Sequence, residues 1–259
     1  MQGNHDLVRR ACSVLSALIL LLLSGFAGAQ AEDTEITELS ELPDSPAWVE
    51  ALGEEYGAEQ LLVVAGVGKT TAMVSLHEKD ESGCWRELMA VPGFIGRNGL
   101  GKTREGDGKT PVGVFYFNAA FGIADDPGCA IAYHKVTHDD YWSSDQREGF
   151  AYNRMVSIRD YPELNRSDSE HLEEYILEYQ YCLSISYNEE GIPGAGSAIF
   201  LHCQGNTYYT GGCVAIPEAQ MRTVMQTVRE DCVVVIDSQE ALNRRLRIFR
   251  GSAERSGDF

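Results

Sequence analysis

The stretch FLHCQGNTYYTGGCVAIP, residues 200–217, decides how the fold of this sequence is interpreted. Two short apolar segments, 200–202 and 213–216, flank a polar loop that contains Gly and Asn, residues typical of turns. This pattern predicts a β-hairpin in which His202 and Cys213 stand at neighbouring strand ends, within side-chain reach. Whether the two residues form a catalytic pair determines most of what the sequence says about function.

Thiol chemistry gives the pair a functional interpretation. A cysteine with a pKa near about 8.5 is only slightly ionised at neutral pH, and an adjacent imidazole can accept its proton. Gly211 and Gly212 let the backbone approach a substrate, so amides near Gly212 and Cys213 are candidate oxyanion donors. The alternative, that Cys213 is a small buried apolar residue in a strand, stays open on these residues alone. Cys203 lacks the neighbouring glycines and is predicted to be structural.

The remainder of the chain reads mostly as short β-strands separated by Gly, Pro, Asn and Asp. The expected strands are residues 61–67, 71–79, 85–91, 113–122, 181–188, 198–203, 212–217 and 232–237. A short helix is predicted after Ser45, its N-cap, and Pro46, its first residue. A second helix opens at 217–218, with Met221, Val224, Met225 and Val228 on its core face. Residues 167–180 are a candidate for one more short helix.

The N-terminal segment has the order of a secretory signal peptide. Arg9 and Arg10 precede an apolar stretch over 12–23, and small-residue cleavage patterns follow at 27–29 and 29–31. An uncleaved membrane anchor is the alternative. The predicted organisation is a signal peptide or anchor (1–29), an acidic linker with a short helix (30–57), one mainly-β domain (58–240) and a polar tail (241–259). The chain is therefore expected to be exported to the cell envelope or beyond it, touching a membrane only through its N-terminus.

Charge and motif spacing exclude two classes of partner. The formal net charge of −18, without a basic stripe, argues against nucleic acid. The chain contains three Gly-Lys-Thr sequences. In the two at 68–70 and 108–110, which suggest a phosphate-binding loop, the glycine required five residues before the Gly-Lys pair is replaced by Val63 and by Thr103. Nucleotide binding is therefore not expected at these two sequences.

The spacing of the histidines does not support a metal site, and the spacing of the cysteines does not determine whether disulfide bonds form. His134 and His138 are four residues apart, but β-branched residues between them disfavour a helix, so they are interpreted as surface histidines beside a substrate cleft. Six cysteines follow the predicted signal peptide. That even number permits disulfides outside the cell, although spacing does not determine their pairing.

Three ordered motifs resemble the L,D-transpeptidase (YkuD-type) family, which acts on bacterial peptidoglycan through a cysteine acyl-enzyme. The sequence TGGCVAIP after GSAIFLH is similar to the family's catalytic motif. The segment over 104–122 resembles its glycine- and threonine-rich strand, and the segment over 141–156 is similar to one branch of the family. The matching positions are Thr110, Pro111, Gly113, Phe115, Trp142, Asp145, Tyr152, Asn153, His202, Thr210, Gly212, Cys213 and Val214.

The resemblance implies a mainly-β, twisted β-sandwich-like catalytic domain with one or two short helices. Cys213 would be the nucleophile and His202 the base, while Gly212 and Gly211 would supply oxyanion amides. Thr210, Tyr209, Trp142 and Asn153 would bind peptidoglycan stem peptides. The chemistry requires no metal or organic cofactor.

Two departures bear on substrate rather than on chemistry. Gly211 stands where the family usually has histidine, and Ala215 where it usually has arginine or asparagine. Transfer to an amine, hydrolysis by the same site (an L,D-carboxypeptidase) and a non-catalytic wall-binding module remain open alternatives.

Overall fold

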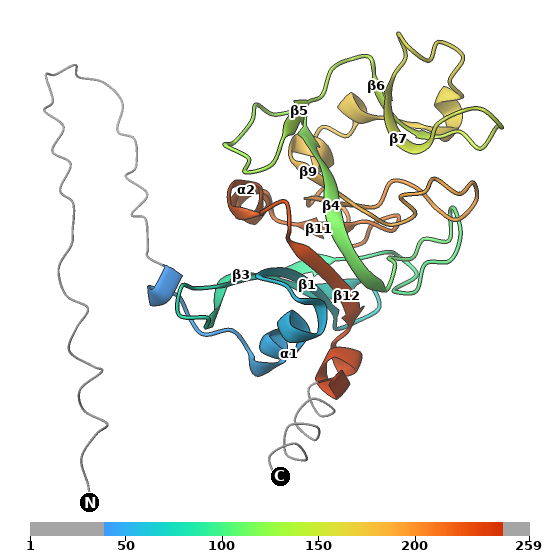
Figure 1. The fold of residues 1–259 in the computed structure, drawn as a ribbon. Coiled ribbons are helices and arrows are strands. Elements are labelled where there is room, and N and C mark those ends of the chain that lie inside the picture. Colours follow the sequence, from blue (N-terminus) through green and yellow to red (C-terminus); the bar gives the residue numbers. More distant parts are fainter. Residues whose placement is uncertain (1–38, 246–259) are drawn as a thin grey trace, which may run out of the picture. The chain divides into compact units, whose positions relative to one another are not determined.

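Strand β1 (Gln60–Gly66) carries the longest apolar run in the fold and is buried on both faces. In the computed structural model, which describes residues 39–245, Leu62 and Val64 point into the main hydrophobic core. Leu61 and Val63 point to the opposite face, where helix α1 (Ala47–Tyr56) covers them (Figure 1). Because side chains alternate along a strand, a continuous apolar sequence is what burial between two layers requires.

The other elements follow in chain order. Strands are β2 (Thr71–Lys79), β3 (Trp85–Phe94), β4 (Gly113–Gly122), β5 (Tyr133–Lys135), β6 (Asp140–Ser144), β7 (Tyr152–Ser157), β8 (Glu170–His171), β9 (Cys182–Ile185), β10 (Phe200–Cys203), β11 (Val214–Ile216) and β12 (Val233–Ser238). Helix α2 spans Glu218–Thr227, and short 3₁₀ turns are η1 (Leu39–Glu41), η2 (Arg166–Asp168), η3 (Leu172–Glu174) and η4 (Glu178–Gln180).

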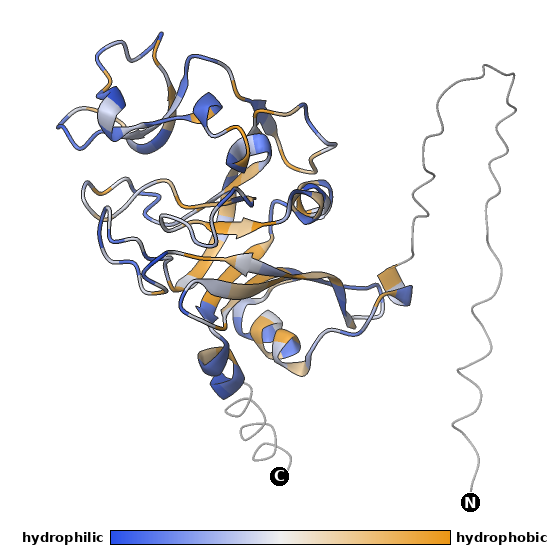
Figure 2. Ribbon diagram, turned by 180° about the vertical axis from the view of Figure 1, so that it is seen from behind, coloured by the Kyte–Doolittle hydropathy of each residue, from blue (hydrophilic) through white to orange (hydrophobic). Residues whose placement is uncertain are grey.

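The main sheet curls until it meets itself. Its nine strands run in the order β12-β1-β2-β3-β11-β10-β9-β4-β5, and β12 also pairs with β4. Several of these strands consist mainly of hydrophobic residues, whereas the loops are mixed or hydrophilic (Figure 2). The enclosed core includes Leu201, Val214, Ile216 and the buried face of α2. The prediction of a mainly-β, twisted fold is confirmed.

A second, three-stranded sheet in the order β7-β6-β8 joins the main sheet through an aromatic cluster. Phe121 of β4 is fully buried at its centre and contacts the rings of Trp142, Tyr179 and Phe200. Cys213 belongs to the same cluster. The aromatic packing therefore fixes the small sheet beside the end of β11.

Every strand expected from the sequence is present, and both principal helices are confirmed. The predicted hairpin over residues 200–216 is wrong, because β10 and β11 pair in parallel, with Leu201 opposite Val214. The loop between them crosses from one end of the strand pair to the other instead of reversing the chain. The turn residues in the loop do not distinguish a parallel pair of strands from a hairpin.

Helix boundaries account for the other differences. Pro46, not Ser45, is the N-cap of α1, and the Ser45 hydroxyl is instead 2.9 Å from Nδ1 of His77. Residues 167–180 form 3₁₀ turns and β8 rather than an α-helix. Residues 239–245 are helical, and Leu242 packs against the α1 side of the sheet, within the segment predicted as a tail. The predicted signal peptide (1–29), residues 30–38 and residues 246–259 lie outside the described part.

Replacing Phe121 by Ala tests the aromatic cluster as the junction between the sheets. We expect the substitution to lower the free energy of unfolding by about 3–5 kcal/mol, because it removes a fully buried ring and leaves a cavity. Urea denaturation measures the loss. Phe115→Ala, which removes an only partly buried ring of the same strand, should cost clearly less; equal losses would contradict this role of Phe121.

Candidate active site

A cavity of about 370 Å³ opens beside the end of β11. Five residues predicted from the sequence line it: Cys213, His202, Thr210, Tyr209 and Gly211. Gly212, Trp142 and Asn153 are buried and do not line the cavity. The structure thus brings the proposed nucleophile and base to one cavity, and separates two of the proposed substrate-binding residues from it.

Parallel pairing explains why His202 and Cys213 face the same space. His202 stands opposite Ala215, and Cys213 precedes Ala215 by two residues. Because alternate residues of a strand point to one face, Cys213, Ala215 and His202 share a side of the sheet. All three line the cavity.

The backbone of Cys213 is fixed by two hydroxyl groups, one from its own loop and one from a loop that is distant in sequence. Its carbonyl oxygen accepts hydrogen bonds from Oγ1 of Thr210 at 2.7 Å and Oγ1 of Thr110 at 3.2 Å. Thr110 is fully buried and also accepts the N–H of Gly96 at 2.9 Å. The threonine of the 104–122 motif therefore holds the residue that carries the thiol.

The glycines before Cys213 have different roles. Gly212 has φ +155°, and a Cβ there would lie 2.9 Å from the carbonyl oxygen of Lys109, so a larger residue would not fit. Its N–H donates to Oγ1 of Thr210 at 3.1 Å, a bond it would have to release to bind an oxyanion. A Cβ on Gly211 would meet nothing within 4 Å. The cavity therefore has free space at position 211, where the L,D-transpeptidase family usually has a histidine.

The sulfur of Cys213 is held in a mostly buried position. The N–H of Phe200 points to Sγ at 3.4 Å, and the thiol donates to the carbonyl oxygen of Ala198 at 3.1 Å. Burial, and then the negative charge of Glu170, raise the pKa of Cys213 to about 12, against the opposing effects of the Phe200 N–H and Lys102. The resting residue is a neutral thiol.

His202 is correspondingly neutral. Burial lowers its pKa, although the Cys203 carbonyl and the charge of Glu178 act in the opposite direction. Nδ1 lies 2.7 Å from that carbonyl oxygen, which fixes Nδ1 as the donor and leaves Nε2 as a proton acceptor. Cys203 itself is buried in the main core, as expected of a structural cysteine. The described cysteines, Cys213 included, are all unpaired.

Trp142 and Asn153 position the turn that receives the thiol hydrogen. Oδ1 of Asn153 accepts the indole N–H of Trp142 at 2.9 Å and the N–H of Ala198 at 3.0 Å. Ala198 has φ +52°, a left-handed conformation that needs such support. Trp142 and Asn153 therefore support the Ala198 backbone, and their expected role in substrate binding stays a prediction.

The cavity also has an acidic wall, whose residues were not among those predicted from the sequence. Its additional ionisable lining residues are Lys102, Glu105, Glu170, Tyr175, Glu178 and Tyr179. Nζ of Lys102 is 3.3 Å from Asp107, and Glu105 accepts the Ser197 hydroxyl at 2.7 Å. Glu170 accepts the Tyr179 hydroxyl at 2.5 Å, and burial raises its pKa to about 7. Lys102 and Glu105 come from one loop, whereas the other four residues come from the single segment 170–179.

The two histidines interpreted as neighbours of a substrate cleft lie elsewhere. Neither His134 nor His138 lines the cavity. Nε2 of His134 is 2.9 Å from Oδ2 of Asp140, and His138 contacts Glu173. The two histidines therefore do not act together at the cavity, although they are four residues apart in sequence.

Comparison with known proteins places the chain in a family. Residues 67–236 match the model of the L,D-transpeptidase catalytic domain (YkuD), and the chain belongs to that family. Among solved structures, it is similar to the helical cell shape determining protein Pgp2 from Campylobacter jejuni, with 13% identity and a TM-score of 0.37. That similarity covers 78% of this chain and 62% of the Pgp2 chain. Curated protein sequences give no match.

Over residues 39–245, no helix is long and apolar enough to cross a membrane.

Glu170→Gln tests the electrostatic coupling in the cavity. An unfolded glutamate ionises near pH 4.5, but folded Glu170 only near pH 7, so the protein loses stability as pH rises through this interval. The variant should therefore gain about 1–3 kcal/mol relative to wild type between pH 4 and pH 8. It should also lower the pKa of Cys213 and speed iodoacetamide alkylation at pH 8. Urea denaturation at both pH values and alkylation rates are the measurements; a pH-independent stability difference would contradict the coupling.

Asn153→Ala tests the support of the Ala198 turn. Loss of the acceptor for the Ala198 N–H, with alanine forced to φ +55°, should cost about 1–3 kcal/mol and alter the alkylation rate of Cys213. Asn188→Ala is a matched control, because Asn188 also has a left-handed backbone (φ +50°) but does not contact Ala198. Equal effects of both variants on Cys213 reactivity would contradict the positioning role.

Proposed function

We propose that this protein is an exported cysteine L,D-transpeptidase that acts on peptidoglycan stem peptides. The chain belongs to the L,D-transpeptidase (YkuD) family, which acts on peptidoglycan, and this membership supports peptidoglycan as the class of substrate. The observation that carries the proposal is the convergence of a buried thiol and a neutral imidazole on one cavity, with Nδ1 of His202 held by the Cys203 carbonyl. The signal-like N-terminal sequence supports export.

The proposed reaction proceeds in two acyl transfers. Nε2 of His202 accepts the thiol proton as Sγ of Cys213 attacks the carbonyl of the third stem residue. The N–H of Cys213 is the nearest candidate to stabilise the oxyanion. Collapse of the tetrahedral intermediate breaks the amide bond; His202 returns the proton to the departing amine, and a D-amino acid leaves. An acceptor amine then attacks the thioester, loses its proton to His202 and releases the Cys213 thiol.

The acidic wall favours an amine as the acceptor over water. Glu170 and Glu178 line the same cavity as Cys213, and Lys102 is ion-paired with Asp107. Negative charge raises the local concentration of an ammonium group. Because the pKa of Glu170 is about 7, its carboxylate can take a proton from an approaching ammonium near neutral pH.

Intact-mass analysis with a carbapenem tests the nucleophile. We expect one covalent adduct on the wild type and on Cys203→Ala, and none on Cys213→Ala, because only Cys213 lines the cavity. His202→Gln should slow adduct formation by about 10²–10⁴-fold, the contribution of a general base. An adduct on Cys213→Ala, or no adduct on a folded wild type, would exclude Cys213 as the acylated residue.

Product analysis with stem tetrapeptides distinguishes transfer from hydrolysis. Cross-linked dimers formed with release of a D-amino acid support the transpeptidase. Tripeptide alone identifies an L,D-carboxypeptidase on the same site, and no product despite tight peptidoglycan binding identifies a binding module.

A further inference from the structure

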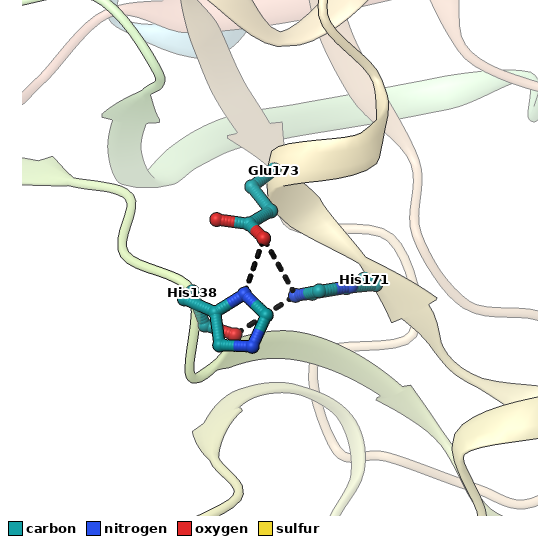
Figure 3. A group of neighbouring side chains, drawn as sticks. All are labelled: His138, His171 and Glu173. Atoms are coloured by element: carbon teal, nitrogen blue, oxygen red, sulfur yellow. Dashed lines mark hydrogen bonds and ion pairs between the residues drawn. The ribbon is translucent and has the colours of Figure 1, made fainter.

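Three potential metal ligands meet on the small sheet, away from the catalytic cavity. His138 lies in the turn before β6, His171 on β8 and Glu173 in η3. Figure 3 shows both rings and the carboxylate converging. One ligand atom from each residue lies within 4.8 Å of the other two. The pairing of Tyr141 with His171 between β6 and β8 holds these segments together.

The spacing suits a tetrahedral ion. Metal–ligand bonds of about 2.1 Å at tetrahedral angles place ligand atoms about 3.4 Å apart. Nε2 of His171 is 3.6 Å from Oε1 of Glu173, and Nδ1 of His138 contacts that same oxygen. A small opening of the His138 ring would make room for an ion between all three.

His171 is already oriented as a metal ligand would be. Its ring stacks on Tyr141 at 4.4 Å with an interplanar angle of 4°, which fixes the plane of the imidazole. Nδ1 lies 3.1 Å from Oε1 of Glu174, the outer carboxylate contact that commonly supports a ligating histidine. The other nitrogen, Nε2, faces the cluster.

Oxygen atoms surround both nitrogens of the His171 ring. Nε2 is also 2.8 Å from the carbonyl oxygen of His138. This arrangement accommodates a positive charge at Nε2, whether a proton or a metal ion supplies it. A cation bound at Nε2 leaves Nδ1–H for Glu174 and places its charge beside Glu173 and the His138 carbonyl.

We propose that His138, His171 and Glu173 bind a divalent transition-metal ion of the Zn²⁺ type. Two imidazoles and a carboxylate are a ligand set that zinc accepts, and water or the His138 carbonyl can fill the fourth position. His138 and Glu173 are accessible, with side chains 75% and 38% exposed, so an ion can enter from solvent. The ion would join the turn before β6 to β8 and η3, and so brace the segment that carries Glu170 into the catalytic cavity.

Zinc titration of the metal-stripped protein tests this site, in a Cys213→Ala background so that the reactive thiol does not contribute. We expect one site by calorimetry and a zinc-dependent rise in Tm. His138→Ala and Glu173→Gln should each weaken affinity by about 100-fold or more and abolish the rise, and Glu174→Gln should weaken it by about tenfold. His134→Ala is the matched control, because His134 bonds Asp140 outside the cluster, and it should leave binding unchanged.

Co²⁺ provides an independent readout of the ligands. Nitrogen and oxygen ligands give d–d bands without sulfur-to-cobalt charge transfer, and these bands should disappear in Glu173→Gln. The proposal is overturned by zinc binding that His138→Ala and Glu173→Gln leave intact, by a thiolate spectrum, or by the absence of both binding and a Tm shift. The variants alter exposed side chains, and circular dichroism verifies their folding.

Discussion

The carbonyl oxygen of Cys213 accepts hydrogen bonds from Thr110 and Thr210, and the geometry of the cavity depends on this arrangement. The two hydroxyls come from loops 100 residues apart in sequence and fix the backbone where it enters β11. With that backbone fixed, Sγ has two immediate partners, the N–H of Phe200 and the carbonyl of Ala198. A nucleophile held in this way loses little conformational entropy when a substrate arrives.

Burial determines the protonation state of the pair. It raises the pKa of Cys213 and lowers that of His202, so both effects disfavour a thiolate–imidazolium pair at rest. The proton would then move as the substrate carbonyl is attacked, when the growing charge can be stabilised by amides and the imidazole. Such a thiol reacts slowly with small electrophiles in bulk solvent. Glu170 strengthens this protection by adding a negative charge near the sulfur.

Local sequence patterns predicted the strands well, because alternation and turn residues are encoded within each segment. The same patterns predicted that His202 and Cys213 lie close together, and both line one cavity. The predicted hairpin is wrong, however, because the two strands pair in parallel. The error arises because loop composition indicates a change of direction without specifying which strands become neighbours. Trp142 and Asn153 were selected as motif residues, but their contact with Ala198 depends on tertiary packing and has no local signal. Most of the acidic wall comes from residues 167–180, which the sequence presented as a helix candidate without indicating that they line a cavity.

Strand β8 presents two adjacent side chains to two separate places. Its two residues alternate in direction, so Glu170 lines the cavity that contains Cys213 and His171 joins the histidine–glutamate cluster. The strand has only one neighbour, β6, and its position rests on few hydrogen bonds. A ligand that ties His171 to the turn before β6 would therefore restrain Glu170 as well. Because Glu170 influences the pKa of Cys213, restraint at the surface cluster offers a direct physical route to the electrostatics of the thiol.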